Sequence, residues 1–172
     1  MFKRPDTKYI ANHEGAKYLE PGGYVIRIDS CHDDESRQSL EIAYEIVEGE
    51  CKGDSARRIA KGWNPNRFWV GYGERMQWQA GNFIKAVEDT NSCHLDDRYI
   101  CRDLVNRQLG IVLQYRTCNG SRTLRPAYFC SADKIRSGDY TLPKEKTDGS
   151  QVFTEIKNNS TVEGGDDGEL PF

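Results

Sequence analysis

The sequence has no long apolar run and is polar overall. Hydrophobic residues make up 37% of its 172 positions, and the mean hydropathy is -0.78. The N-terminal region lacks the roughly 7 to 15 apolar residues that follow the basic part of a secretory signal. We therefore expect a protein without a membrane segment, located in the cytoplasm of a bacterial host cell.

Motifs for nucleotide and nucleophilic chemistry are absent as well. The chain contains neither GxxxxGK followed by Ser or Thr nor GxGxxG, so nucleotide hydrolysis has no motif behind it. No Ser or Cys nucleophile pattern surrounds the three histidines, which are His13, His32 and His94. We expect a protein that is not an enzyme and has no cofactor. One alternative stays open, because the acidic run 32–35 could hold Mg²⁺ and serve a small metal-dependent nuclease.

The cysteines include no C-x-x-C pair, which removes the strongest sequence signal for structural zinc. Cys93, His94 and Cys101 could still supply metal ligands. Cysteines of an intracellular protein are usually reduced, and cysteine is among the residue types most often buried. We therefore expect no metal site and six reduced thiols, at Cys31, Cys51, Cys93, Cys101, Cys118 and Cys130.

Charge is distributed unevenly along the chain, whose formal net charge is -3. Residues 145–172 hold seven of the 27 acidic residues and two of the 24 basic ones, which leaves residues 1–144 with a small excess of bases. A cationic body with an anionic tail is expected if the tail competes with DNA for the body, or if it keeps the protein soluble. The length suits one domain followed by a tail.

Alternation of apolar and polar residues predicts two antiparallel hairpins. The first joins a strand over 24–29 to a strand over 40–47 through a polar loop at 32–39. The second joins a strand over 110–116 to one over 124–130 through an Asn119-Gly120 turn. Proline at position 126 places the returning strand at an edge or a bulge.

Helical periodicity is confined to three segments. An apolar stripe from Met76 to Val87 predicts one helix that packs on the sheet and runs to about Asp89. Asp96 could cap a short helix through Leu104, and a further short helix is expected at 133–136.

The stretch 56–78 contains five basic residues, one acidic residue and five aromatic residues, and neither period fits it throughout. Its Gly, Asn and Pro residues predict a surface loop. Basic side chains neutralise phosphates, while aromatic rings stack on bases of any identity. The alternative is that the rings are core residues of short strands. The candidate DNA contacts here are Arg57, Arg58, Lys61, Trp63, Arg67, Trp69, Tyr72 and Arg75.

The second predicted hairpin is also basic and aromatic. An extended hairpin of this composition could reach around a single strand, although an ordinary surface hairpin would have the same pattern. The candidate DNA contacts on it are Tyr115, Arg116, Arg122 and Arg125.

The chain ends in clustered carboxylates followed by Leu-Pro-Phe. The phenylalanine ring could fill an apolar pocket of another protein, the carboxylates could pair with basic residues around it, and proline limits the entropy lost on docking. Acidic tails are also common as solvated, disordered segments. The candidate partner-binding residues are Asp166, Asp167, Glu169, Leu170, Pro171 and Phe172.

This terminal segment resembles the acidic tip of bacterial single-stranded DNA-binding proteins, and the layout of the body is similar to the OB-fold single-strand binders of bacteriophages. The resemblance implies a mainly β fold with one packing helix, an OB-fold-like five-stranded barrel over 1–143 and a disordered acidic tail over 144–172. It further implies sequence-tolerant binding and protection of single-stranded DNA in DNA replication, recombination or repair, with replication or recombination enzymes recruited by the tip. A homodimer is the favoured assembly if the chain oligomerises.

Two other functions stay open. The protein could be an adaptor or decoy that occupies a host enzyme's pocket with its tip and binds no DNA. It could also be the metal-dependent nuclease considered above.

Overall fold

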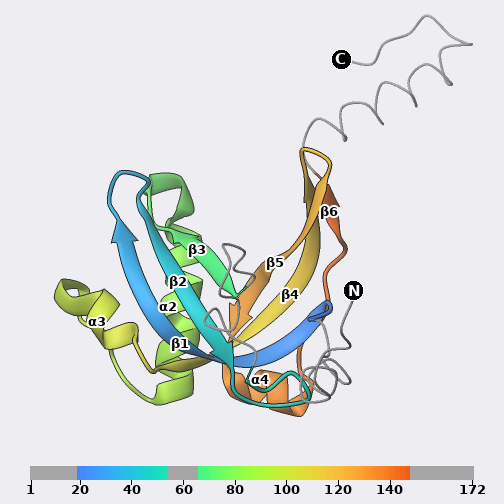
Figure 1. Ribbon diagram of the computed structural model, residues 1–172. Helices are drawn as coiled ribbons and strands as arrows, with labels where there is room; N and C mark the ends of the chain where they lie inside the picture. Colours follow the sequence, from blue (N-terminus) through green and yellow to red (C-terminus); the bar gives the residue numbers. More distant parts are fainter. Residues whose placement is uncertain (1–18, 54–65, 148–172) are drawn as a thin grey trace, which may run out of the picture.

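The computed structural model describes residues 19–53 and 66–147, and Figure 1 shows a mainly β architecture with a few short helices. Candidate contacts Arg57, Arg58, Lys61 and Trp63 and the acidic tip 166–172 lie outside the described residues. Five antiparallel strands form a sheet in the order β3-β2-β1-β4-β5, and a short β6 pairs parallel to β4. The strands are β1 (Gly22–Asp34), β2 (Ser39–Ile46), β3 (Arg67–Gly71), β4 (Gln108–Cys118), β5 (Ser121–Cys130) and β6 (Lys146–Thr147).

Strand β1 belongs to both halves of the sheet. Its residues 22–27 pair with β4, and its residues 26–34 pair with β2 across an irregularity between Ile28 and Ser30. A bulge increases the local twist and bends the strand. Alternate residues of the central strands point into one core, and Ile26, Ile28 and Ile111 are fully buried there.

The two edge strands of this open sheet approach each other, because the sheet curls around helix α2 (Gln77–Asn91), which packs on β3, β4 and β5. Phe83 of α2 is fully buried between two rings of the edge strands. Its ring centroid lies 6.0 Å from that of Phe68 on β3 and 5.2 Å from that of Phe129 on β5. Phe68 and Phe129 are themselves 5.2 Å apart, so three rings bridge the two edges. We call Phe68, Phe83 and Phe129 the seam cluster.

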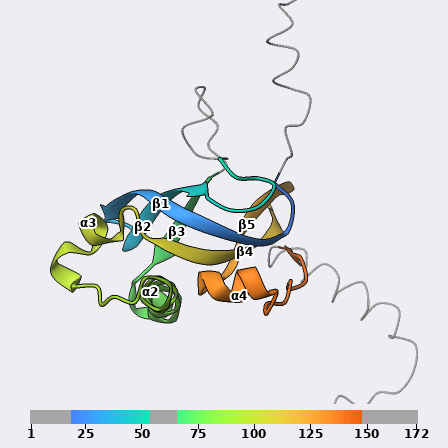
Figure 2. The ribbon, with the colours of Figure 1, turned by 90° about the horizontal axis from the view of Figure 1, so that it is seen from below.

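A second helix, α4 (Ala132–Ser137), packs on β1 and β4, and Figure 2 shows it beside α2, which is seen nearly end-on. Gly110 makes this close approach possible, because a Cβ there would lie 2.6 Å from the Ile135 side chain and 2.7 Å from the Ser131 carbonyl. The Thr90 hydroxyl of α2 accepts a hydrogen bond from the Ala132 amide at 3.0 Å. The short helix expected at 133–136 is therefore present as α4, and it packs on the sheet as a second helix where only one packing helix was predicted.

The remaining helical turns follow the predicted positions closely. Asp96 caps the 3-10 turn η3 (Asp97–Tyr99) by accepting a hydrogen bond from the Arg98 amide, and α3 (Ile100–Leu104) follows directly. Another 3-10 turn, η2 (Glu74–Met76), leads into α2.

The second hairpin has the predicted turn. Asn119 and Gly120 have φ values of 51° and 75°, as a type I′ turn requires. The irregularity of this hairpin lies beside Pro126 of the edge strand β5, which pairs with Leu113 of β4. Both features were predicted correctly.

Three sequence-based expectations were wrong in their boundaries. The polar segment 32–34 is not loop, because strand pairing with β2 continues to Asp34 despite the acidic side chains. The segment 57–78 is not loop throughout, since 67–71 form β3 and Trp78 lies in α2. Strand pairing also continues past the predicted domain boundary at 143, to Thr147.

Candidate nucleic-acid interface

Strand β3 presents an aromatic ring and a cation on its outer face. Phe68 and Val70 point into the core and are buried, so Arg67 and Trp69 point outward. Trp69 is 43% exposed. In the sheet it pairs with Glu41, which in turn pairs with His32. The indole therefore stands at the edge of the β1-β2-β3 surface, where a stacking partner can reach it.

A carboxylate already accompanies the cation of this face. The Arg67 guanidinium donates a hydrogen bond to Glu41 of the neighbouring strand, and both side chains are partly exposed. An exposed ion pair of this kind contributes little to stability, so either member can exchange its partner for solvent or a ligand. The pair holds Arg67 alongside Trp69.

Tyr72 follows β3 and is tied to β1. Its hydroxyl donates a hydrogen bond to the Asp33 carboxylate at 2.7 Å. This bond, together with the nearby acids Asp34 and Glu35, raises the pKa of Tyr72 to about 12. The ring is thus committed to a structural contact, and it lies next to the most acidic part of the surface.

Further exposed side chains surround the start of α2. Met76 lies against Gly71 at the end of β3, where a Cβ on the glycine would be 3.0 Å from that of Met76. Arg75 is exposed in η2, and Trp78 is 66% exposed in the first turn of α2. Trp78 was not among the contacts named from the sequence, although it ends the stretch 56–78 that was expected to bind DNA.

The β4-β5 hairpin carries the second group of candidates. The Arg122 guanidinium lies 3.8 Å from the centroid of the Tyr115 ring, which is a cation-π contact. The same guanidinium donates two hydrogen bonds to Glu145, at 2.9 and 2.8 Å. These bonds hold the pKa of the Glu145 carboxyl below its usual range and raise the pKa of Arg122.

The basic group predicted on this hairpin is divided between two faces. Residues that pair directly share a face, so Arg122 lies with Thr117 and, diagonally, with Tyr115. Arg125 pairs with Gln114 and lies on the opposite face, as does Arg116. The expectation of one cluster of three arginines was therefore wrong, because the period of two separates position 122 from 116 and 125.

The acids of the first hairpin are engaged in local contacts. Asp33 accepts the Tyr72 hydroxyl, and Asp34 accepts hydrogen bonds from the Ser36 hydroxyl and the Arg37 amide. These bonds hold the pKa of Asp34 below its usual range, the Ser36 bond most strongly. Within residues 19–53 and 66–147, no three His, Cys, Asp or Glu side chains gather in a way that could hold a metal ion. Helices long and apolar enough to cross a membrane are likewise missing from those residues.

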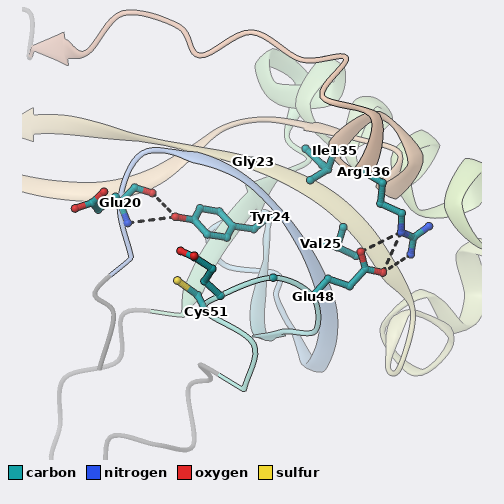
Figure 3. A pocket seen from close by; sticks show the side chains of 10 residues that line it. Glu20, Gly23, Tyr24, Val25, Glu48, Cys51, Ile135 and Arg136 are labelled. Carbon is teal, nitrogen blue, oxygen red and sulfur yellow. Dashed lines mark hydrogen bonds and ion pairs between the residues drawn. The ribbon is translucent and has the colours of Figure 1, made fainter. Parts of the chain in front are cut away.

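A pocket of about 660 Å³ lies away from these surfaces, between β1, the segment after β2 and α4. Figure 3 shows two polar contacts at its rim. The Tyr24 hydroxyl donates to the Glu20 carbonyl at 2.6 Å, and Arg136 donates to both carboxylate oxygens of Glu48 at 2.6 to 3.0 Å. The Arg136 bonds hold the pKa of Glu48 below its usual range. The charges of Glu48 and Arg136 are thus paired with each other at the rim of the pocket.

Comparison with known proteins gives a family but no activity. No curated protein matches the chain. A family described as "Protein of unknown function (DUF669)" matches residues 6–164, which is nearly the whole sequence. The chain therefore belongs to the DUF669 family.

Proposed function

We propose that the protein binds single-stranded DNA without strong sequence preference, on an OB-type barrel whose β3-β5 seam is closed by side chains. An OB-fold is a five-stranded, partly open barrel that binds oligonucleotides on the face of its second and third strands and on the loops after its first and fourth strands. The sheet order, the curl and the seam cluster are consistent with that architecture.

The observation that carries the proposal is the outer face of β3. Full burial of Trp69 would stabilise the fold, yet the indole stays 43% exposed, on the same face as the Arg67 guanidinium, while both of its strand neighbours are buried. An exposed ring can stack on a base, and a cation beside it can pair with the phosphate of the same strand. Arg75 and Trp78 lie at the start of α2, after β3, and can extend this contact.

Charge favours a direction for the bound strand. The end of β1 and the turn that follows it carry Asp33, Asp34 and Glu35, which repel phosphates. The β4-β5 hairpin instead carries exposed Arg116 and Arg125. The strand would therefore run from the β3 face toward the β4-β5 hairpin and avoid the β1-β2 turn.

In this proposal the acidic tip 166–172 recruits replication or recombination enzymes and does not hold the DNA. Removal of the tip should leave DNA affinity unchanged or raise it, because the tip is anionic, and should abolish enzyme recruitment. Loss of DNA binding on truncation would refute this division of roles.

Fluorescence anisotropy with a labelled oligonucleotide tests the proposal. Trp69→Ala should weaken binding about 5- to 140-fold, since stacking on one ring contributes about 1 to 3 kcal/mol per base. Arg125→Gln should reduce the slope of log affinity against log salt by about 0.7. Tyr99→Ala is the matched control, because Tyr99 is an exposed ring beside α3 that stacks with Arg102.

The same titration separates the rival functions. Absence of binding at low salt would refute the proposal and favour the adaptor that binds no DNA. Loss of the oligonucleotide only when Mg²⁺ is added would favour the nuclease. Equal weakening by Trp69→Ala and Tyr99→Ala would refute the assignment of the β3 face.

A further inference from the structure

Two cysteines from distant parts of the chain meet at the edge of the core. Cys31 lies in β1, where it pairs with Ile42 of β2, and Cys101 lies in α3. Their Sγ atoms are 2.6 Å apart, although 70 positions separate them in the sequence. Both residues are half-buried and pack against the core cluster.

The segment that carries Cys101 is already fixed on both sides. Before it, the Leu95 amide donates to the Glu88 carboxylate of α2 at 2.8 Å. After it, the Asn106 amide donates to the Ile28 carbonyl at 2.8 Å, and the Ile28 amide donates to the Arg107 carbonyl at 2.9 Å. These bonds position α3 against β1, so the fold brings the two cysteines together.

We propose that Cys31 and Cys101 form a reversible disulfide that fastens α3 to β1. The bond needs side chains whose sulfurs can meet without backbone movement, and this condition is met. The proposal is independent of DNA binding, because neither cysteine lies on the β3 face or on the β4-β5 hairpin.

A low-molecular-weight disulfide such as oxidised glutathione can act as the oxidant. The Cys101 thiolate attacks one sulfur of the oxidant, which gives a mixed disulfide and releases one small thiolate that takes a proton. Cys31 Sγ then attacks Cys101 Sγ, its proton passes to the leaving sulfur, and a second small thiol departs. Two protein thiols are thereby oxidised to one disulfide, and one small disulfide is reduced to two thiols.

The surroundings of Cys31 are consistent with this order. Burial, and next the hydrogen bond with Cys101, raise the pKa of the Cys31 thiol above its usual value. A thiol kept protonated is a poor first nucleophile, since the thiolate is the reactive form. It can still react in the second step, because the fold holds it against the mixed disulfide.

The experiment treats the full chain with oxidised glutathione, alkylates the remaining thiols and maps the peptides by mass spectrometry. We expect a peptide pair linked through Cys31 and Cys101 that disappears on reduction. The closed loop should raise the melting temperature by on the order of 10 °C. Cys118→Ser should behave like the wild type in both measurements, because Cys118 is exposed at the end of β4.

The variants Cys31→Ser and Cys101→Ser should each lose the linked peptide and the rise in melting temperature. Oxidation of the wild type without a Cys31-Cys101 peptide would overturn the proposal. A linked peptide with an unchanged or lower melting temperature would overturn it too, since it would mean that the bond distorts the native arrangement. The wild-type peptide map decides the question even if a serine variant folds poorly.

Discussion

The seam cluster makes a strong prediction about what holds the curled sheet together. Replacement of Phe83 with Ala removes the ring that touches both edge strands, at a position with no exposure to solvent. Phe68 and Phe129 would keep their mutual contact, but each would face a cavity where the third ring had been. The replacement should therefore lower the stability of the fold and, in consequence, loosen the position of β3.

The expected loss of stability is about 3 to 5 kcal/mol, which is typical for Phe→Ala in a packed core. Domains usually have about 5 to 15 kcal/mol of unfolding free energy in total. The variant should therefore fold only marginally. Phe83→Leu keeps most of the buried volume and should lose clearly less.

Urea unfolding followed by circular dichroism measures this directly. The midpoint should fall for Phe83→Ala while the slope of unfolding free energy against urea stays constant, because the surface exposed on unfolding is nearly unchanged. Trp78→Ala is the matched control on the same helix, since it removes a larger ring that is 66% exposed. We expect its effect to be within about 0.5 kcal/mol.

Two results would refute the reasoning. A loss below about 1 kcal/mol for Phe83→Ala would mean that the seam cluster does not hold the edges together. An equal loss for Trp78→Ala would mean that ring size matters and contact with the edge strands does not.

Other predictions follow from single contacts. Gly110→Ala should lower the unfolding free energy by about 1 to 3 kcal/mol in urea titrations, because its Cβ would meet the backbone at the start of α4, whereas Gly81→Ala, with open space in α2, should raise it by about 1 kcal/mol. Tyr72 should ionise near pH 12 in an NMR titration, and Asp33→Asn should return its pKa toward 10.0. A carboxyl with a depressed pKa stabilises the fold above its unfolded pKa, and this contribution is lost as the pH falls through its folded pKa. The melting temperature of Glu145→Gln should therefore fall less steeply than that of the wild type below about pH 4.5.

Much of the fold could be predicted from the sequence, because the periodicity of apolar residues and the residues of the turns indicate the same elements. The second strand alternates apart from the buried Ala43, the Asn119-Gly120 turn admits positive φ, and the stripe ending at Val87 marks the main helix. Each of these signals is local. A local pattern needs no knowledge of the partner strand, so it survives when only the sequence is known.

The contacts that close the fold left no such trace. Phe83 was predictable as a core residue, but no local pattern indicates that its ring lies between the two edge strands, β3 and β5. Spacing along the sequence does not place Cys31 against Cys101 either. The contacts of Phe83 and the contact between the two cysteines both depend on the curl of the sheet. Pairing of residues 146–147 with β4 was missed for a related reason, because a two-residue parallel strand has no period to detect.

Strand β3 was missed for a reason that bears on function. Its sequence, Arg-Phe-Trp-Val-Gly, alternates between outward and inward positions, but Trp69 occupies an outward position where a polar residue would have completed the pattern. A sequence usually departs from local rules where some other requirement overrides packing. The residue that hides the strand from a period-two reading is therefore the same residue that the proposed function needs in solvent.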